Sequence, residues 1–261
     1  MQSVEPSREN IKAERQPRGL LQLTLCRPER SNALSPAMIQ EIDREIAAAE
    51  GDASVRLIVL RGEGKHFCGG ADIGAPRTQT SDDENAPRGP SLADTLLRWD
   101  RLAKPTVAFV QGACLGAGLA LVSCCDVVVA APSAFFAMPE VRRGMVPGIL
   151  PFFLRAIGPR AFRRFGLSGE RFDASAALRC GLVSEIYAQS EWGNAQARLL
   201  DSFLHAAPGA LAAIKAEAAR HAVGAIDPDR MLGRKRVESA EEVEGKASFR
   251  EKREPNWYVR E

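Results

Sequence analysis

Two glycine-bearing segments of the chain have the composition to present bare backbone amides to a ligand. One is HFCGGADI at residues 66–73, and the other is QGACLGAG at residues 111–118. Each follows an apolar stretch, and small residues let a ligand approach backbone N–H groups closely. Two such donors aimed at one carbonyl oxygen form an oxyanion hole, in which each donor stabilises a developing enolate by roughly 3–4 kcal/mol. Taken singly, either segment also fits a tight turn with no further role, because glycine turns are common.

A glutamate follows the second of these turns, in the run FFAMPEVRRGMVPG at residues 135–148. The carboxyl group of Glu140 comes directly after an apolar stretch. Apolar surroundings raise the pKa of a carboxyl group toward the range that suits proton transfer. The alternative interpretation is a glutamate at the start of a helix that faces solvent. Together with the two turns, Glu140 indicates a site that moves a proton beside a stabilised enolate.

The composition excludes several other classes of protein. The chain has 261 residues, of which 45% are hydrophobic, and a net charge of +2. These values predict a folded chain and argue against a nucleic-acid or anionic-membrane partner. The six cysteines form no C-x-x-C pair, which is typical of a reduced, cytoplasmic protein. No His, Cys, Asp or Glu cluster has the spacing of metal ligands, so we predict no metal site. Neither turn reads G-x-G-x-x-G with an acidic residue about 20 positions later, which disfavours a nucleotide-binding dehydrogenase.

Strand and helix patterns alternate along the first part of the chain. Apolar runs predict strands at residues 20–25, 55–60, 106–110 and 126–131, and helical spacing predicts helices at 36–51, 92–102 and 115–124. Ser35 and Pro36 have the residue types of an N-cap and a first helical position. This order predicts an α/β fold with a parallel sheet. Beyond Pro159 the pattern is helical, at 161–167, 174–180, 192–205 and 208–222.

Three stretches of unusual composition allow more than one interpretation. The polar residues 1–17 lack an apolar core, so we expect a mobile start and not a secretory signal. Residues 74–90 are rich in Pro, Gly, Asp and Ser, which predicts a long surface loop. Residues 105–138 carry one charge, Asp126, yet their glycines and Pro132 favour buried strands and a buried helix over a membrane span.

Four motifs in order resemble the crotonase superfamily, the enoyl-CoA hydratases and isomerases. They are HFCGGADI, KPTVAFVQGACLGAGLALVSCCD, FAMPEVRRGMVPG and AEEVEGKASFREKREPNW, and the resemblance runs from about Leu20 to Trp257. It implies a ClpP-like spiral of ββα units over residues 1–200, followed by a helical C-terminal region over residues 201–261. It also implies an acyl-CoA substrate, no cofactor apart from the coenzyme A of that substrate, and a homotrimer or a dimer of trimers built through the helical region.

The same resemblance implies roles for individual residues. The N–H groups of Gly69 and Ala117 would hold the thioester oxygen, and Glu140 matches the second of the two catalytic glutamates of the hydratases. The residues matching those that contact coenzyme A lie in two parts of the chain. These are Ala33, Ala71, Asp72 and Ile73, with Arg27 beside them, and Phe249 and Lys252, which in the family reach the coenzyme A of a neighbouring subunit.

One departure from the family pattern concerns the reaction. The first catalytic glutamate of the two-glutamate hydratases corresponds to Ala120, which can neither bind nor deprotonate water. The stretch ILPFFLR at residues 149–155 resembles bacterial 3-methylglutaconyl-CoA hydratases, so we expect hydration of an enoyl-CoA, with a 3-branched glutaconyl-type acyl group as one option. A Δ3,Δ2-enoyl-CoA isomerase, which needs one base, is the second hypothesis, and a decarboxylase is the third. A non-catalytic acyl-CoA-binding protein is the alternative from another class.

Other polar side chains have less specific interpretations. His66 and Asp72 are weak candidates for holding a water molecule, since a lone histidine is more often a structural partner. The arginines near Glu140 are expected to be solvated or to face another subunit. As an alternative, one of them binds a carboxylate on the acyl group. These arginines are Arg142, Arg143, Arg160, Arg163 and Arg164, and Arg155 is a further candidate for binding that carboxylate.

Overall fold

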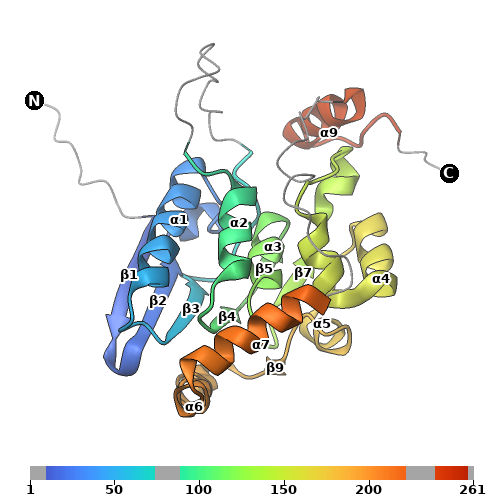
Figure 1. The fold of residues 1–261 in the computed structure, drawn as a ribbon. Coiled ribbons are helices and arrows are strands. Elements are labelled where there is room, and N and C mark those ends of the chain that lie inside the picture. The colour runs from blue at the N-terminus through green and yellow to red at the C-terminus, as the bar shows by residue number, and fades with distance from the viewer. Residues whose placement is uncertain (1–9, 74–88, 222–238, 258–261) are drawn as a thin grey trace, which may run out of the picture.

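The structure, a computed structural model, describes residues 10–73, 89–221 and 239–257. Its largest sheet has six strands in the order β1-β2-β3-β4-β6-β9 (Figure 1). These strands are β1 (Ile11–Gln16), β2 (Leu20–Leu25), β3 (Leu57–Gly62), β4 (Thr106–Val110), β6 (Val127–Ala130) and β9 (Glu185–Ile186). A second sheet has three short strands in the order β5-β7-β8. They are β5 (Ala113–Leu115), β7 (Phe135–Ala137) and β8 (Phe172–Asp173).

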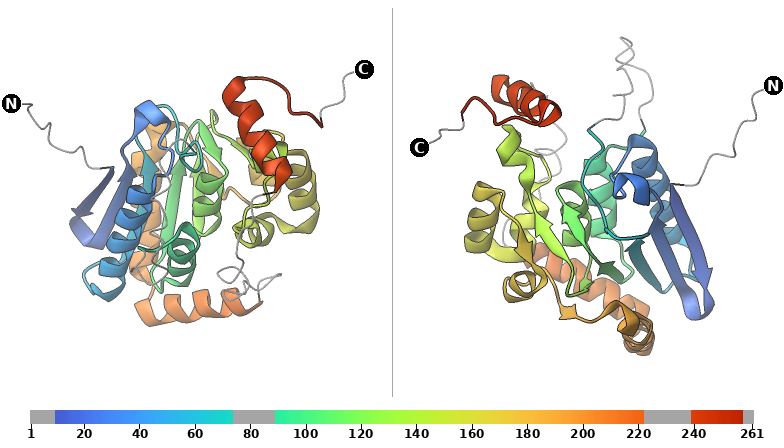
Figure 2. Two further views of the ribbon diagram at one scale, coloured as in Figure 1. Left: turned by 90° about the horizontal axis from the view of Figure 1, so that it is seen from above. Right: turned by 180° about the vertical axis from the view of Figure 1, so that it is seen from behind.

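The helices follow the strands in sequence, and several cover the faces of the main sheet. They are α1 (Pro36–Gly51), α2 (Leu92–Arg101), α3 (Ala117–Ser123), α4 (Leu150–Ser168), α5 (Ala174–Arg179), α6 (Trp192–His205), α7 (Pro208–His221) and α9 (Ala240–Glu251). Four short 3-10 turns complete the description, and one of them, η3 (Pro139–Arg143), carries Glu140. Figure 2 shows α9 against the part of the chain that contains η3, away from the main sheet.

The main sheet is buried on both faces, which explains its uniformly apolar strands. In β3, Ile58 and Leu60 pack into the core beneath α1 and α2, whereas Leu57 and Val59 pack on the opposite face against Trp192 of α6. Strands β2, β3, β4, β6 and β9 are parallel neighbours. The predicted α/β fold with a parallel sheet is therefore confirmed.

The N-terminal segment corrects one expectation. Residues 11–16, predicted to be mobile, form the edge strand β1, which pairs antiparallel with β2. Ile11 is buried while Lys12 and Glu14 form an ion pair at 2.8 Å, so the strand has an apolar end and a charged outer face. Charged side chains are common on edge strands because they discourage further strand pairing. Residues 1–9, like residues 74–88 of the predicted loop, lie outside the described residues.

Helix α1 begins and ends where the sequence predicts, whereas helix α6 spans the expected boundary between the two parts of the chain. Ser35 caps α1, since its hydroxyl accepts the Met38 N–H at 3.3 Å, and Pro36 is the first helical residue. The division expected after residue 200 falls inside α6, which packs on the main sheet. Among the described helices, none has the length and apolar character needed to cross a bilayer.

Asn32 ties the loop after β2 to the chain that leads into the first glycine turn. Its side chain is fully buried, and its backbone φ of 54° is one that asparagine adopts more readily than most residues. The side-chain oxygen accepts the Arg27 N–H at 2.8 Å. The side-chain amide donates to the carbonyls of Glu63 at 2.9 Å and His66 at 2.8 Å. These bonds fix the entry to the segment at residues 66–73.

We expect Asn32→Ala to lower the free energy of unfolding by about 3 kcal/mol, because three buried hydrogen bonds are lost at about 1 kcal/mol each. Denaturant titration followed by circular dichroism measures the change. Asn194→Ala, at an exposed position of α6, is the matched control and should leave the midpoint nearly unchanged. A loss below 1 kcal/mol at position 32 would contradict this structural role.

Candidate active site

The two glycine turns lie side by side. The segment at residues 66–73 runs between two neighbouring stretches of chain. On one side, the Cys68 N–H donates to the Ala113 carbonyl at 3.0 Å, and the Leu115 N–H donates to the Cys68 carbonyl at 2.9 Å. On the other side, the Leu34 N–H donates to the Gly70 carbonyl at 2.8 Å, and the Asp72 N–H donates to the Leu34 carbonyl at 2.9 Å. The pairing thus brings both turns to one place, as an oxyanion hole requires.

The amide of Gly69 does not fit the role predicted for it. Its N–H donates to the Ser31 carbonyl at 2.8 Å, so this donor is already engaged. Leu34 pairs with Ala71 as parallel strands do, through the residues on either side of Ala71. The N–H of Ala71 itself therefore points away from Leu34, toward the segment at residues 113–117. In the described part of the chain this amide has no recorded acceptor, and it replaces Gly69 as the candidate donor.

Ala117 provides the second candidate donor, as predicted. It is the first residue of α3, and the first amides of a helix have no acceptor within the helix. The preceding residue, Gly116, has φ of 49° and donates its own N–H to the Ala137 carbonyl at 3.0 Å. This left-handed conformation turns the chain sharply from β5 into α3. No described residue is recorded as accepting the Ala117 N–H.

The carboxyl group of Glu140 lies directly against the Gly116 turn. A Cβ atom built on Gly116 would clash with Glu140 Oε1, so the glycine allows the carboxyl group to lie this close to the turn. Oε2 is buried and has no hydrogen-bond partner among the described residues. Burial raises the pKa of Glu140, while its own backbone N–H and the charge of Arg143 act in the opposite direction. The result is a carboxyl group that exchanges its proton closer to neutral pH than an ordinary glutamate does.

Ala120 leaves Glu140 without a second carboxylate from α3. The methyl group of Ala120 is fully buried in the apolar core, one helical turn after the free amide of Ala117. It offers no hydrogen-bond donor or acceptor from its side chain. The site therefore combines two backbone donors with one identified acid–base side chain.

The residues expected beside coenzyme A fall into two groups. In the first, Arg27 donates to Asp72 at 3.1 Å and to the Ala33 carbonyl at 2.8 Å, which holds the segment after Ala71 in place. Both members of the Arg27–Asp72 pair are largely buried, whereas Ala71 and Ile73 are exposed. Asp72 is thus a structural partner of Arg27. The contacts of these residues with a ligand stay a prediction.

The second group lies on the C-terminal helix. The Phe249 ring, half exposed, lies under the Arg143 guanidinium of the same chain, 4.2 Å from its centre. Lys252 follows α9 directly, with φ of 54°. Gly245 lets α9 approach so closely that an added Cβ would clash with the Arg143 backbone. The helix is therefore packed onto η3, the turn that carries Glu140.

Several other predicted candidates have structural partners. His66 Nδ1 accepts the Ala113 N–H at 3.1 Å, and burial lowers the pKa of this imidazole. His66 is therefore a neutral hydrogen-bond acceptor that holds β5. Arg155 is paired with Asp100, and Arg164 with Glu170 at 2.7 Å. In the described ranges, no group of three or more His, Cys, Asp and Glu side chains is placed to hold a metal ion.

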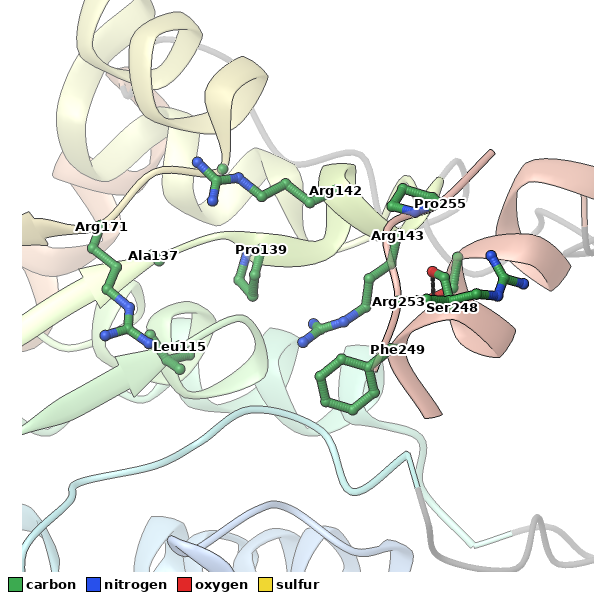
Figure 3. A pocket seen from close by; sticks show the side chains of 12 residues that line it. Leu115, Ala137, Pro139, Arg142, Arg143, Arg171, Ser248, Phe249, Arg253 and Pro255 are labelled. Carbon is green, nitrogen blue, oxygen red and sulfur yellow. Dashed lines mark hydrogen bonds between the residues drawn. The ribbon is translucent and has the colours of Figure 1, made fainter. Parts of the chain in front are cut away.

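A cavity of about 310 Å³ adjoins the contact between Gly116 and Glu140 (Figure 3). Leu115, Ala137 and Pro139 line its inner side, next to the turn and the glutamate. Phe249 and Ser248 of α9 form part of its outer side. Arg171, which the sequence analysis did not single out, also lines it, because β8 pairs with β7 and places position 171 beside η3. No local motif around Arg171 signals this position.

Comparison with known protein families gives one match that spans almost the whole chain. The family described as enoyl-CoA hydratase/isomerase matches residues 15–260. The 2,3-dehydroadipyl-CoA hydratase of Escherichia coli strain K12 is 32% identical over 250 residues, which cover 93% of this chain and 96% of that protein. The mevalonyl-coenzyme A hydratase of Aspergillus fumigatus is 39% identical over 176 residues, 64% of this chain. The matched part spans 62% of the length of that fungal protein.

Solved structures show the same fold. An enoyl-CoA hydratase/isomerase from Pseudoalteromonas atlantica T6c superposes with a TM-score of 0.81 at 25% identity, covering 96% of this chain and all of that one. A putative enoyl-CoA hydratase/isomerase (crotonase) from Legionella pneumophila gives a TM-score of 0.74 at 32% identity, covering 95% of this chain and 99% of that one. These similarities confirm the predicted fold class.

Proposed function

Because the chain belongs to the enoyl-CoA hydratase/isomerase family, we propose that it adds water reversibly to the double bond of a 2-enoyl-CoA. The observation that carries this proposal is the buried Glu140 carboxyl group against the Gly116 turn, beside the free amide of Ala117. Relatives named as hydratases over most of their length support the same reaction class.

The oxyanion hole of this mechanism is formed by the amides of Ala71 and Ala117. Both donate to the thioester oxygen of the bound substrate. When water attacks C3, the electrons of the C2–C3 double bond move into the thioester and leave an enolate oxygen. The two N–H donors stabilise this negative charge more than they stabilise the neutral carbonyl, which lowers the barrier.

Glu140 carries out both proton transfers in turn. Its carboxylate removes a proton from the water as the oxygen bonds to C3, and the resulting carboxylic acid then delivers that proton to C2. The product is a 3-hydroxyacyl-CoA, and the reverse sequence releases water. A single group acting from one side of the substrate gives syn addition, and it needs no carboxylate at the position of Ala120.

A Δ3,Δ2-enoyl-CoA isomerase is the second candidate function, and Ala120 is the observation that favours it. Shifting a double bond needs one base and no water, so a site with one carboxyl group suits this reaction. The enolate and the roles of the two amides are the same in both cases. Only the fate of the double bond distinguishes the two reactions.

Incubation of the purified protein with crotonyl-CoA and with a 3-enoyl-CoA tests the proposal, with mass spectrometry to detect water uptake and ultraviolet absorbance to detect the conjugated 2-enoyl thioester. A gain of one water molecule by crotonyl-CoA supports hydration. Conversion of the 3-enoyl-CoA to the 2-enoyl isomer without water uptake supports the isomerase instead. Binding of both thioesters with no turnover would overturn both and favour a non-catalytic acyl-CoA-binding protein.

The pH dependence of the hydratase should reflect the raised pKa of Glu140. Its carboxylate must be ionised to accept a proton from water, so kcat/KM should rise with pH across this pKa and fall below it. Burial raises that pKa above the ordinary glutamate value of 4.5. We therefore expect the acid limb of the kcat/KM profile for crotonyl-CoA to lie above pH 4.5. A rate that stays constant down to pH 4.5 in a folded protein would contradict this assignment.

We also propose a homotrimer or a dimer of trimers, supported by apolar side chains exposed on the C-terminal helices. Ile214 on α7 and Val243 and Phe249 on α9 are each at least half exposed. Light scattering of the purified protein measures the assembly state. A monomer at micromolar concentration would contradict this part of the proposal.

A further inference from the structure

The cavity beside Glu140 is strongly basic. Four arginines line it, Arg142, Arg143, Arg171 and Arg253, and none of its lining residues is acidic. Arginine is the side chain best suited to planar, bidentate binding of a carboxylate or phosphate. A cavity of this composition beside a reacting centre points to an anionic group on the ligand.

Two of the four arginines are already engaged. Arg253 is paired with Glu244 at 2.6 Å and with Glu251 at 2.6 Å. Arg142 is exposed, and its Nε donates to the Ser168 carbonyl at 2.9 Å. In Figure 3 the Arg142 guanidinium is turned away from the space beside Phe249. The Arg253 guanidinium is thus held by two carboxylates, and the Arg142 guanidinium lies away from the space beside Phe249.

Arg143 and Arg171 are different. Within the described ranges neither has a carboxylate at ion-pair distance nor a recorded hydrogen-bond acceptor for its guanidinium. Each is held against an aromatic ring instead, Arg143 at 4.2 Å from the centre of Phe249 and Arg171 at 4.9 Å from that of Phe135. Such stacking fixes the plane of the guanidinium and leaves its N–H edge available.

The position of Arg143 relative to Glu140 sets the direction in which an acyl group would extend. They are three residues apart on the 3-10 turn η3, a spacing at which side chains lie on the same face. Figure 3 shows the Arg143 guanidinium near Phe249 and the Arg171 guanidinium near Leu115, on two sides of the cavity. An acyl chain that passes Glu140 into this cavity would meet both groups.

We infer that the acyl group of the substrate ends in a second carboxylate, which Arg143 and Arg171 bind in this cavity. The inference rests on the proposed function, because it assigns the far end of an enoyl-CoA whose double bond lies at Glu140. The substrate class is a short, unsaturated dicarboxylic acid joined to coenzyme A through one of its two carboxyl groups. Half-buried Arg143 feels the charge of Glu140 but has no carboxylate at ion-pair distance among the described residues, and the second carboxylate would supply one.

Comparison of glutaconyl-CoA with crotonyl-CoA and with its own methyl ester tests whether the second carboxylate is recognised. Glutaconyl-CoA is crotonyl-CoA with a carboxylate in place of one hydrogen on its methyl group, and its methyl ester removes the charge while adding one methyl group. We expect the wild-type protein to prefer glutaconyl-CoA over the ester at least 10-fold in kcat/KM. Each of Arg143→Gln and Arg171→Gln should reduce this preference about 10-fold, since a charge-assisted hydrogen bond is lost.

The preference is the ratio of the kcat/KM values for glutaconyl-CoA and its methyl ester. A side effect that changes both values equally therefore cancels. Arg143 also lowers the pKa of Glu140, so its removal changes proton transfer, but it does so for both substrates. Arg171 is exposed, and its substitution should leave folding intact. Arg179→Gln, at an exposed position of α5 outside the cavity lining, is the matched control and should leave the preference unchanged.

The outcomes separate this inference from the proposed function. Equal losses on glutaconyl-CoA and its ester would overturn the inference and indicate that the arginines bind the phosphates of coenzyme A or support the fold. Hydration of crotonyl-CoA with no preference for glutaconyl-CoA in the wild-type protein would also overturn it, with the proposed function intact. If none of the three thioesters reacts, the proposed function itself fails.

Discussion

Replacement of Glu140 by glutamine is expected to lower kcat/KM for hydration by about 10³-fold. General acid–base catalysis by one side chain contributes about 10²–10⁴-fold, and Glu140 performs both proton transfers of the mechanism. Glutamine has nearly the same shape, yet it can neither accept a proton from water nor return one to C2. The measurement is the initial rate with crotonyl-CoA, together with the thermal unfolding midpoint of each protein.

The unfolding midpoint should change little, because the carboxyl group of Glu140 is buried and its Oε2 has no partner that glutamine would lose. Glu170→Gln is the matched control, since Glu170 is paired with Arg164 at the exposed end of α4. Its rate should stay within about twofold of the wild-type rate. A Glu140→Gln protein that retains a tenth or more of the wild-type rate would contradict the proposed mechanism.

The second large effect is expected from replacing single backbone amides by esters. Lactic acid in place of alanine at position 71 or 117 removes one N–H and keeps the methyl group. Loss of one oxyanion donor costs about 10²–10³-fold in kcat. Each ester should therefore lower kcat by this amount, with a smaller effect on the binding of the thioester. The rate with crotonyl-CoA and the affinity for a saturated acyl-CoA measure the two effects.

Gly69 provides the control for this experiment. Its N–H is bonded to the Ser31 carbonyl, so glycolic acid at position 69 should weaken the fold by about 1 kcal/mol and leave kcat nearly unchanged. A large loss of kcat at position 69 with none at position 71 would reverse the assignment of the donor. Unfolding of each ester protein in denaturant shows whether a lost rate reflects lost structure.

The contrast between Gly69 and Ala71 shows how far the sequence predicts the site. The composition of the two turns and the apolar run before Glu140 were sufficient to predict which segments meet. Which amide is free depends on pairing with residues 31–34, almost forty positions earlier, and on the φ of 111° at Gly70. A shift of one residue exchanges inward and outward amides, and no local pattern fixes that register.

The fold was predictable where local signals are strong. Ser35 and Pro36 mark the start of α1, and the buried strands of the main sheet are continuous apolar runs. The second sheet was not predicted, because its strands have only two or three residues and are defined by their partners. Arg171 was missed for the same reason, since only the pairing of β8 with β7 brings it to η3.

The close packing of α9 on η3 builds the candidate site from two stretches of chain that are far apart in the sequence. The groups assigned to bond making, the amides of Ala71 and Ala117 and the carboxyl group of Glu140, all precede residue 145. Much of the cavity wall comes later, from Arg171 and from Ser248 and Phe249 of the tail. Substitutions in α9 can thus change the shape of the cavity without replacing a group assigned to the reaction.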